Sequence, residues 1–211
     1  MAVALFGGTF NPIHNGHLRI ASELAELLSI PKIRLMPCAS PSHRQVPQVS
    51  AKQRVEILKA AISEGYPKLD IETIELQRAG PSYSIDSVVS IRQTMDSKAP
   101  LFLCLGMDSF ASLDKWHRWN ELTDYCHIIV CGRPNYIKPQ EGSLINWINQ
   151  HNCDCLSTVK DTPSGCIYFC DLSMLSISST RIRNSIKQKA NIDNMTPPAV
   201  IDYIRQNHLY E

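Results

Sequence analysis

The chain has 211 residues, of which 44% are hydrophobic, so it can bury one substantial core. Its 21 Lys and Arg residues nearly balance 20 Asp and Glu residues, and the formal charge of +1 does not favour a broad nucleic-acid-binding surface. The sequence shows neither a basic leader followed by a long apolar segment nor a run near the ~18 apolar residues of a membrane helix. We therefore expect a single soluble, cytoplasmic domain over residues 1–211, with no membrane or nucleic-acid partner. Composition leaves a monomer and a homodimer equally open.

Short apolar runs typical of buried strands alternate along the chain with segments of helical periodicity. The expected strands are 2–6, 32–36, 69–75, 101–105, 127–131 and 166–170. The expected helices are 18–29, 51–64, 84–95 and a final packed helix after Pro197-Pro198. This alternation predicts an α/β fold with a doubly wound parallel sheet of the Rossmann-like type. Ligands of such sheets bind beyond the carboxyl ends of the strands, where the Gly7 turn, the Pro37–Arg44 loop and Gly106-Met107-Asp108 would emerge.

The most specific pattern follows the first strand and reads Gly7-Gly8-Thr9-Phe10-Asn11-Pro12-Ile13-His14-Asn15-Gly16-His17. A strand, a glycine turn and a helix N-terminus bring backbone N–H groups together, which favours a bound anion. His14 and His17, spaced i and i+3, can share one helical face and donate imidazole N–H groups to phosphoryl oxygens. The stretch therefore predicts a nucleotide-phosphate site.

A second polar pattern lies far along the chain and reads Ser176-Ile177-Ser178-Ser179-Thr180-Arg181-Ile182-Arg183. Serine and threonine favour helix N-caps, and Ile182 and Ile186 continue the pattern as a helix. Hydroxyl, guanidinium and free N–H donors would then face one anion. A triphosphate fits that set of donors.

The two patterns resemble signatures of one superfamily. His14-Asn15-Gly16-His17 resembles the H-x-G-H signature of the nucleotidylyltransferases, and residues 177–183 resemble their I-S-S-T-x-I-R signature. The segments between them are similar in order and spacing to those of the bacterial nicotinate mononucleotide adenylyltransferases over nearly the whole chain; they are Pro37–Arg44, Pro81–Ser84, Gly106–Ser109 with Trp116, and His127–Pro134. The resemblance implies that ATP adenylylates nicotinate mononucleotide, giving nicotinate adenine dinucleotide and pyrophosphate in NAD biosynthesis.

The resemblance also implies which residues hold ATP. These are Gly8, Thr9, Phe10, His14, His17, Arg44, Ser178, Ser179, Thr180 and Arg181. Among them His14, His17 and Arg181 are the expected catalytic residues, because they would neutralise charge at the phosphates. Mg²⁺ is the expected cofactor, held mainly by ATP phosphates and water, with no metal site made by the protein itself.

On the acceptor side, the resemblance implies four residues that contact the mononucleotide. Backbone N–H groups around Ser84 would bind the pyridine carboxylate, Trp116 would stack on the ring, Asp108 would accept from ribose hydroxyls and Arg133 would lie near the mononucleotide. The sequence departs from the family at two places. Asn11 replaces a frequent aspartate, and Cys38-Ala39 stand where an asparagine is expected, which removes an amide contact to the acceptor.

The eight cysteines do not have the spacing of a zinc site. Cys153 and Cys155 are too close for a zinc knuckle, and Cys166 and Cys170 fall within an expected strand. We expect reduced thiols instead.

Two alternatives remain open at this point. The acceptor could be another phosphorylated molecule, such as nicotinamide mononucleotide or phosphopantetheine, because both signatures address the shared ATP. The chain could also be a non-catalytic nucleotide sensor that uses the fold only for binding.

Overall fold

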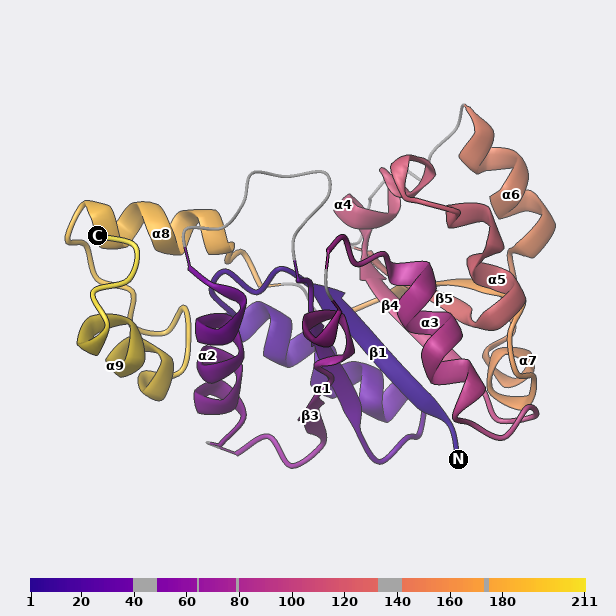
Figure 1. Ribbon diagram of the computed structural model, residues 1–211, viewed down its shortest axis with the longest axis horizontal. Helices are drawn as coiled ribbons and strands as arrows, with labels where there is room; N and C mark the ends of the chain where they lie inside the picture. The colour runs from indigo at the N-terminus through magenta and orange to yellow at the C-terminus, as the bar shows by residue number, and fades with distance from the viewer. Residues whose placement is uncertain (40–48, 64, 79, 133–141, 173–174) are drawn as a thin grey trace.

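The structure, a computed structural model, describes residues 1–39, 49–63, 65–78, 80–132, 142–172 and 175–211. The described residues form a six-stranded parallel sheet with helices packed on both of its faces, as Figure 1 shows. This confirms the α/β, doubly wound fold expected from the alternation of strands and helices. Figure 1 also shows that α8 and α9 lie at one end of the molecule, whereas α3 to α7 gather at the other.

The elements have the following bounds. The strands are β1 (Val3–Gly8), β2 (Ile33–Pro37), β3 (Leu69–Ile71), β4 (Leu101–Gly106), β5 (His127–Gly132) and β6 (Ile167–Asp171). The α-helices are α1 (Asn15–Leu27), α2 (Ala51–Ser63), α3 (Ser84–Gln93), α4 (Met107–Phe110), α5 (Leu122–Tyr125), α6 (Ser143–His151), α7 (Leu156–Asp161), α8 (Ser179–Lys187) and α9 (Pro198–Gln206). Three short 3₁₀ turns are η1 (Ile74–Gln77), η2 (Leu113–Lys115) and η3 (Trp119–Glu121).

The strand order, β3-β2-β1-β4-β5-β6, reverses its direction of winding between β1 and β4. β1 pairs in parallel with β2 on one side and with β4 on the other, with Phe6 opposite both Leu35 and Cys104. In open parallel sheets, such a reversal leaves a crevice beyond the carboxyl ends of the two strands, because their connections run to opposite faces. The carboxyl ends here are Gly7-Gly8 and Gly106. The predicted glycine turn therefore lies at the edge of the sheet where such a crevice is expected.

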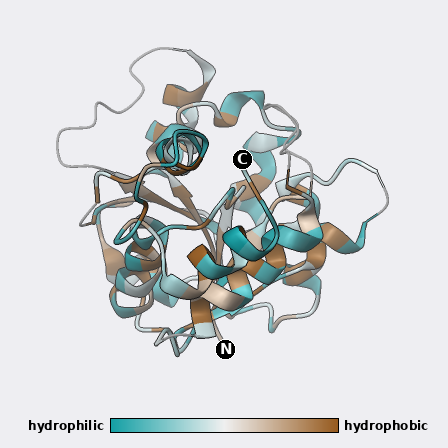
Figure 2. Cartoon of the chain, turned by 90° about the vertical axis from the view of Figure 1, so that its left-hand side faces the viewer, coloured by the Kyte–Doolittle hydropathy of each residue, from teal (hydrophilic) through white to brown (hydrophobic). Residues whose placement is uncertain are grey.

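Alternate residues of each strand enter different cores because side chains of a strand point to opposite faces. Ala4 and Phe6 of β1 join a core that includes α1, α2 and α9, whereas Leu5 joins a second core with α3 and α6. Figure 2 shows apolar residues along the strands and polar residues on the outer helices. Burial on both faces accounts for the nearly continuous apolar runs in the sequence.

The structure differs from the expected elements at two places. The third strand ends at Ile71 rather than at residue 75, and residues 74–77 form η1. The chain leaves the sheet edge there because Glu75 turns inward and accepts a hydrogen bond from the Ala39 N–H. The second difference is that the four helices α4 to α7 were not expected; the apolar face of α6 packs in the second core.

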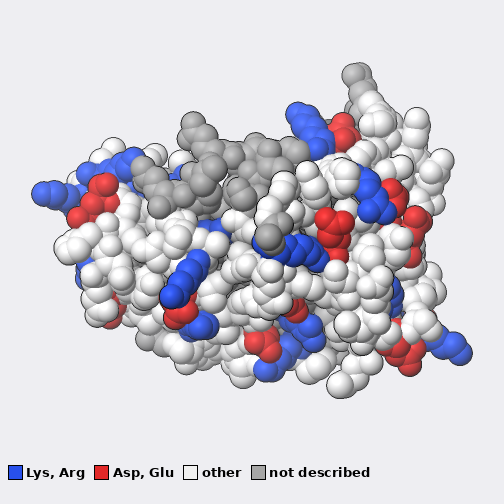
Figure 3. Space-filling view, viewed as in Figure 1, with Lys and Arg blue, Asp and Glu red and all other residues white. Residues whose placement is uncertain are grey.

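Charges of both signs are interspersed on the face shown in Figure 3. Among the described residues, no helix is both long enough and apolar enough to span a bilayer.

Candidate active site

The loop between β1 and α1, residues 9–14, packs its aromatic rings over neighbouring glycines. Phe10 has a left-handed backbone with φ of 48°, and its ring is 2% exposed. A Cβ on Gly8 would lie 2.9 Å from that ring, closer than van der Waals contact allows. A Cβ on Gly16 would similarly lie 3.0 Å from Nδ1 of His14. Two of the three glycines of the pattern, Gly8 and Gly16, are therefore required by the aromatic rings packed over them.

His14 and His17 form a stacked pair at the N-terminus of α1, with ring centroids 3.6 Å apart. His14 is the N-cap, and its Nδ1 accepts a hydrogen bond from the His17 N–H at 3.3 Å. Burial lowers the pKa of His14 to about 4, and burial together with the neighbouring His14 holds the pKa of His17 well below its usual range. Both rings are therefore neutral at pH 7.

The hydrogen bonds assign the remaining proton of each ring. His14 Nδ1 accepts, so its proton lies on Nε2. Nδ1 of His17 is buried without a partner among the described residues, and an unpaired N–H there would cost more than a bare lone pair. We therefore assign the His17 proton to Nε2 as well. The pair offers two N–H donors to an anion without adding positive charge.

The second motif adjoins the first, so two segments far apart in the sequence lie side by side. Ser179 Oγ donates to the carbonyl of Pro12 at 2.8 Å, and the Cβ of Leu175 lies 3.8 Å from the Cβ position of Gly16. Ser178 is the N-cap of α8, and its Oγ accepts from the Arg181 N–H at 3.2 Å. The N-termini of α1 and α8 thus lie beside the same loop.

Arg181 and Thr180, both expected to contact ATP, are exposed. Arg181 Nη1 donates to the carbonyl of Ser176 at 3.3 Å. Arg183, which ends the same motif and was not selected, donates from Nη1 to the carbonyl of Asn11 at 2.8 Å. The helical spacing could have indicated this contact, because Arg183 lies four residues after Ser179 and shares its face of α8. Arg181 lies two residues after Ser179 and is rotated away by about 200°.

Arg54 of α2 joins the signature loop to the start of the predicted acceptor loop. Its guanidinium donates to the carbonyl of Thr9 at 2.9 Å, to that of Cys38 at 2.6 Å and to that of Ala39 at 3.1 Å. The side chain is 1% exposed and its Nε has no partner among the described residues. Sequence reasoning missed Arg54, although it occupies a position of the helical stripe that Ile57 and Leu58 continue.

Glu75 is a second buried charge that sequence reasoning missed. It is 3% exposed, accepts from the Ala39 N–H at 3.3 Å and lies 3.5 Å from the Ser87 hydroxyl of α3. Burial raises the pKa of Glu75 to about 7, although that hydrogen bond and the charges of Arg78 and Arg54 oppose the shift. Glu75 therefore connects the acceptor loop to the N-terminal part of α3.

The structure brings two of the predicted acceptor segments together. Helix α3 begins at Ser84, whose N–H is among the first of the helix and has no intrahelical acceptor. The preceding residue, Tyr83, packs its ring 4.4 Å from that of His117, next to Trp116. Trp116 is partly buried against the second core, and Asp108 is exposed in α4, directly after β4.

Two predicted residues, Arg44 and Arg133, lie outside the described residues. Within the described part of the chain, no group of three or more His, Cys, Asp or Glu side chains has a metal-binding arrangement. All eight cysteines carry free thiols.

The chain is similar in sequence to known proteins. A family model described as cytidylyltransferase-like matches residues 5–185. A probable nicotinate-nucleotide adenylyltransferase of Pectobacterium atrosepticum is 38% identical over 99% of this chain and 98% of its own. Another, from Pseudomonas aeruginosa, is 39% identical over 99% and 96%.

Solved structures show the same fold. A Plasmodium falciparum nicotinic acid mononucleotide adenylyltransferase complexed with NaAD superimposes with a TM-score of 0.76 at 17% identity, covering 99% of this chain and 97% of that one. A putative nicotinate-nucleotide adenylyltransferase from Vibrio parahaemolyticus gives 0.64 at 17% identity, covering 99% and 94%. At that identity the likeness shows the fold alone.

Proposed function

This chain belongs to the cytidylyltransferase-like family, and we propose that its single domain, residues 1–211, is a nicotinate-nucleotide adenylyltransferase. It transfers the adenylyl group of ATP to nicotinate mononucleotide and releases pyrophosphate. The observation that carries the proposal is the meeting of the two motifs: the Ser179 hydroxyl bonds the Pro12 carbonyl, beside the N-terminus of the helix that bears His14 and His17. That meeting lies at the reversal of the strand order, where parallel sheets bind nucleotides.

ATP phosphates bind at the two adjoining helix N-termini. His14 and His17 donate from Nε2, and free N–H groups of α1 and α8 add to the field that favours an anion. Gly8, Thr9 and Phe10 present backbone to the nucleotide. The other proposed ATP contacts are Arg44, Ser178, Ser179, Thr180 and Arg181, to which the geometry adds Arg183.

In the reaction, a phosphate oxygen of nicotinate mononucleotide attacks the α-phosphorus of ATP. The new P–O bond forms as the bond between the α-phosphorus and the bridging oxygen breaks, and pyrophosphate leaves with that electron pair. The attacking phosphate is already anionic at pH 7, so the step needs no side-chain base. Catalysis rests on alignment and on donors that meet the charge as it shifts toward the leaving group. Neutral His14 and His17 supply such donors.

A divalent metal ion, which we propose to be Mg²⁺, fits this set of donors. The described side chains next to the loop are imidazole, hydroxyl and guanidinium groups, which bind phosphate oxygens, so the ion would be held by the nucleotide phosphates and water. When bound, Mg²⁺ would neutralise part of the triphosphate charge.

The acceptor lies on the α3 side of the crevice. N–H groups at Ser84 meet the pyridine carboxylate, Trp116 stacks on the ring, and Asp108 accepts from the ribose; Arg133 completes the proposed set. Cys38 and Ala39 offer no side-chain amide at the loop, so the carboxylate contact at α3 carries a larger share of recognition. Because the eight cysteines carry free thiols, as proteins of reducing compartments do, we place the reaction in the cytoplasm.

The test is pyrophosphate release at fixed ATP and Mg²⁺ with nicotinate and nicotinamide mononucleotides side by side. A carboxylate offers acceptors to both N–H groups, whereas a carboxamide leaves one buried donor unpaired at a cost of ~1–3 kcal/mol. We expect at least about tenfold higher kcat/KM with the acid. Equal efficiency would assign the chain to a dual-specificity or nicotinamide-directed enzyme, and no release with either would leave an enzyme for another phosphorylated acceptor or a nucleotide sensor.

A further inference from the structure

The last part of the chain holds the backbone of the signature loop through a series of hydrogen bonds. Successive carbonyls from Asn11 to Ile13 each accept from a side chain of residues 179–196; the donors are Arg183 at 2.8 Å, Ser179 at 2.8 Å and Thr196 at 2.9 Å. Asn15 adds bonds in the other direction, from its N–H to Met195 O at 2.9 Å and from its side-chain amide to Asn194 O at 2.8 Å. The loop that presents His14 is therefore fixed from outside.

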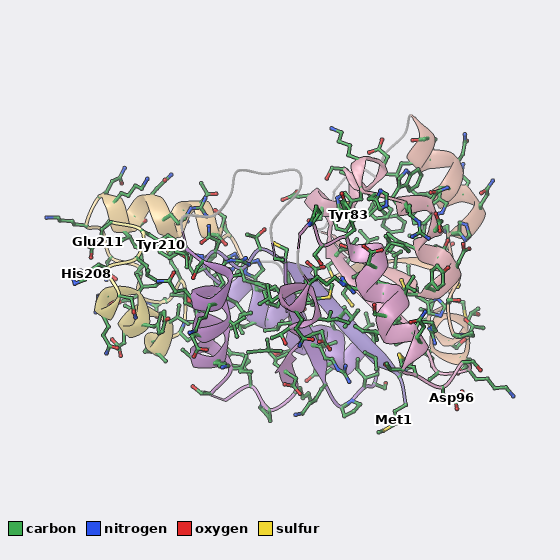
Figure 4. All side chains as sticks on the ribbon, in the orientation of Figure 1. Met1, Tyr83, Asp96, His208, Tyr210 and Glu211 are labelled. Atoms are coloured by element: carbon green, nitrogen blue, oxygen red, sulfur yellow. The ribbon has the colours of Figure 1, made fainter. Side chains whose placement is uncertain are left out.

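Asn11 is held at both its backbone and its side chain. Its carbonyl accepts from Arg183, and its side-chain Oδ1 accepts from the phenol of Tyr210 at 2.7 Å. Figure 4 shows Tyr210 close to α8 at the left of the view, whereas Tyr83 of the acceptor side lies right of the centre. The bond joins positions 199 residues apart.

Tyr210 is itself firmly placed. It is 4% exposed, and its neighbour Leu209 is buried and donates its N–H to Ile204 O at 3.0 Å. Burial raises the pKa of Tyr210 above its usual range, against the opposing charges of Arg183 and Arg54. The phenol therefore keeps its proton at pH 7 and donates to Asn11.

We propose that Tyr210 is a positioning residue of the active site: by bonding Asn11 it fixes the loop that sets the His14–His17 pair. The effect on turnover rests on the proposed adenylyl transfer, whereas the effect on the imidazoles does not. Under this proposal the partner of the Asn11 side chain is Tyr210. Asparagine can replace the aspartate that is frequent at this position because its amide offers the same acceptor oxygen to the phenol.

The experiment compares Tyr210→Phe with the matched control Tyr203→Phe, which removes an α9 hydroxyl that makes no hydrogen bond within the described residues. Turnover is measured as pyrophosphate release at a temperature where circular dichroism shows every variant folded. We expect Tyr210→Phe to lower kcat about fivefold to tenfold with KM for the mononucleotide unchanged, since one buried hydrogen bond to the loop is lost. Tyr203→Phe should match the unmodified protein.

Asn11 variants separate positioning from general loosening. Asn11→Ala should lower kcat by a similar factor, and adding Tyr210→Phe to it should lower kcat no further, because both changes delete one contact. Asn11→Asp keeps an acceptor oxygen and should retain near-normal kcat. Multiplicative losses in the double variant, or equal losses in Tyr203→Phe, would overturn the proposal.

A substrate-free measurement separates this inference from the proposed function. Imidazole resonances of His14 and His17, followed by ¹⁵N-edited NMR, should shift in Tyr210→Phe and stay in place in Tyr203→Phe. Unchanged resonances in Tyr210→Phe would overturn the positioning role. If the unmodified protein releases no pyrophosphate while these resonances shift, the proposed reaction fails and the positioning role stands.

Discussion

Glu75 offers a quantitative test of the buried network beneath the acceptor loop. The carboxyl group is 3% exposed, and burial raises its pKa from 4.5 to about 7. Each unit of pKa shift corresponds to ~1.36 kcal/mol, so ionised Glu75 costs the folded protein about 3 kcal/mol relative to the unfolded chain. Glu75→Gln removes the charge, while its amide can still accept from the Ala39 N–H and donate to the Ser87 hydroxyl.

The raised pKa fixes the sign of the pH dependence. Between 4.5 and about 7 the folded state holds a proton on Glu75 that the unfolded state has released. The contribution of this group to stability therefore falls as pH rises through that window and is fully unfavourable above about 7. The variant lacks this penalty, so it should exceed the unmodified protein in stability by an amount that widens by about 2 kcal/mol between pH 5 and pH 8.

Urea unfolding of both proteins at several pH values measures this difference directly, because all other titrations cancel in the comparison. Glu26→Gln is the matched control, since the Glu26 side chain is 69% exposed. A constant difference between Glu75→Gln and the unmodified protein across the pH range would refute the reasoning. It would show that Arg78 and Arg54 stabilise the ionised carboxylate enough to offset its burial.

Three further predictions concern the reacting groups and the loop. His17→Ala should lower turnover by about a hundredfold or more in a folded protein, because such a donor is worth ~2.7–4 kcal/mol; near-normal pyrophosphate release would contradict this. Trp116→Ala should raise KM for the mononucleotide far more than KM for ATP, since stacking is worth ~1–3 kcal/mol, and equal rises would indicate a packing role. Gly8→Ala should lower both Tm and turnover because its Cβ meets the Phe10 ring at 2.9 Å. Gly7→Ala is the control and should be tolerated, because its Cβ has contacts only at 4.0 Å. Equal effects of the two substitutions on Tm would count against this steric argument.

The fold was predictable because its signals are local. Apolar runs and helical stripes depend on neighbouring residues, and the alternation of strands with helices predicts a doubly wound sheet. The signature loop was likewise visible as one continuous stretch. Strand 69–75 was predicted too long because Ile74 and Leu76 continue an apolar pattern, while the contact of Glu75 with Ala39 that ends the strand lies outside that window.

The residues that hold the site could not be found in the same way. Arg54 lies in the buried stripe of α2, and nothing in the nearby sequence indicates that its guanidinium donates to three carbonyls. Tyr210 contacts Asn11 across nearly the whole sequence, and no local pattern indicates such a pairing. Arg183 is different, because its spacing from Ser179 already placed it on the loop-facing side of α8.

The contacts divide into two networks that meet at the signature loop. Residues 179–210 hold Asn11 to Asn15 on the proposed ATP side, whereas Arg54 and Glu75 hold Cys38 and Ala39 on the proposed acceptor side. Two links join them: the Thr9 carbonyl accepts from Arg54, and the Gly8 carbonyl accepts from the Cys38 N–H at 3.0 Å. Because each network has its own anchors, substitutions on the acceptor side, such as Cys38-Ala39 in place of an asparagine, can change recognition while the stacked imidazoles keep their geometry. Shared phosphate-binding motifs can therefore serve different acceptors on one fold, which is why the Ser84 and Trp116 region, rather than the histidines, must decide between the nicotinate and nicotinamide substrates.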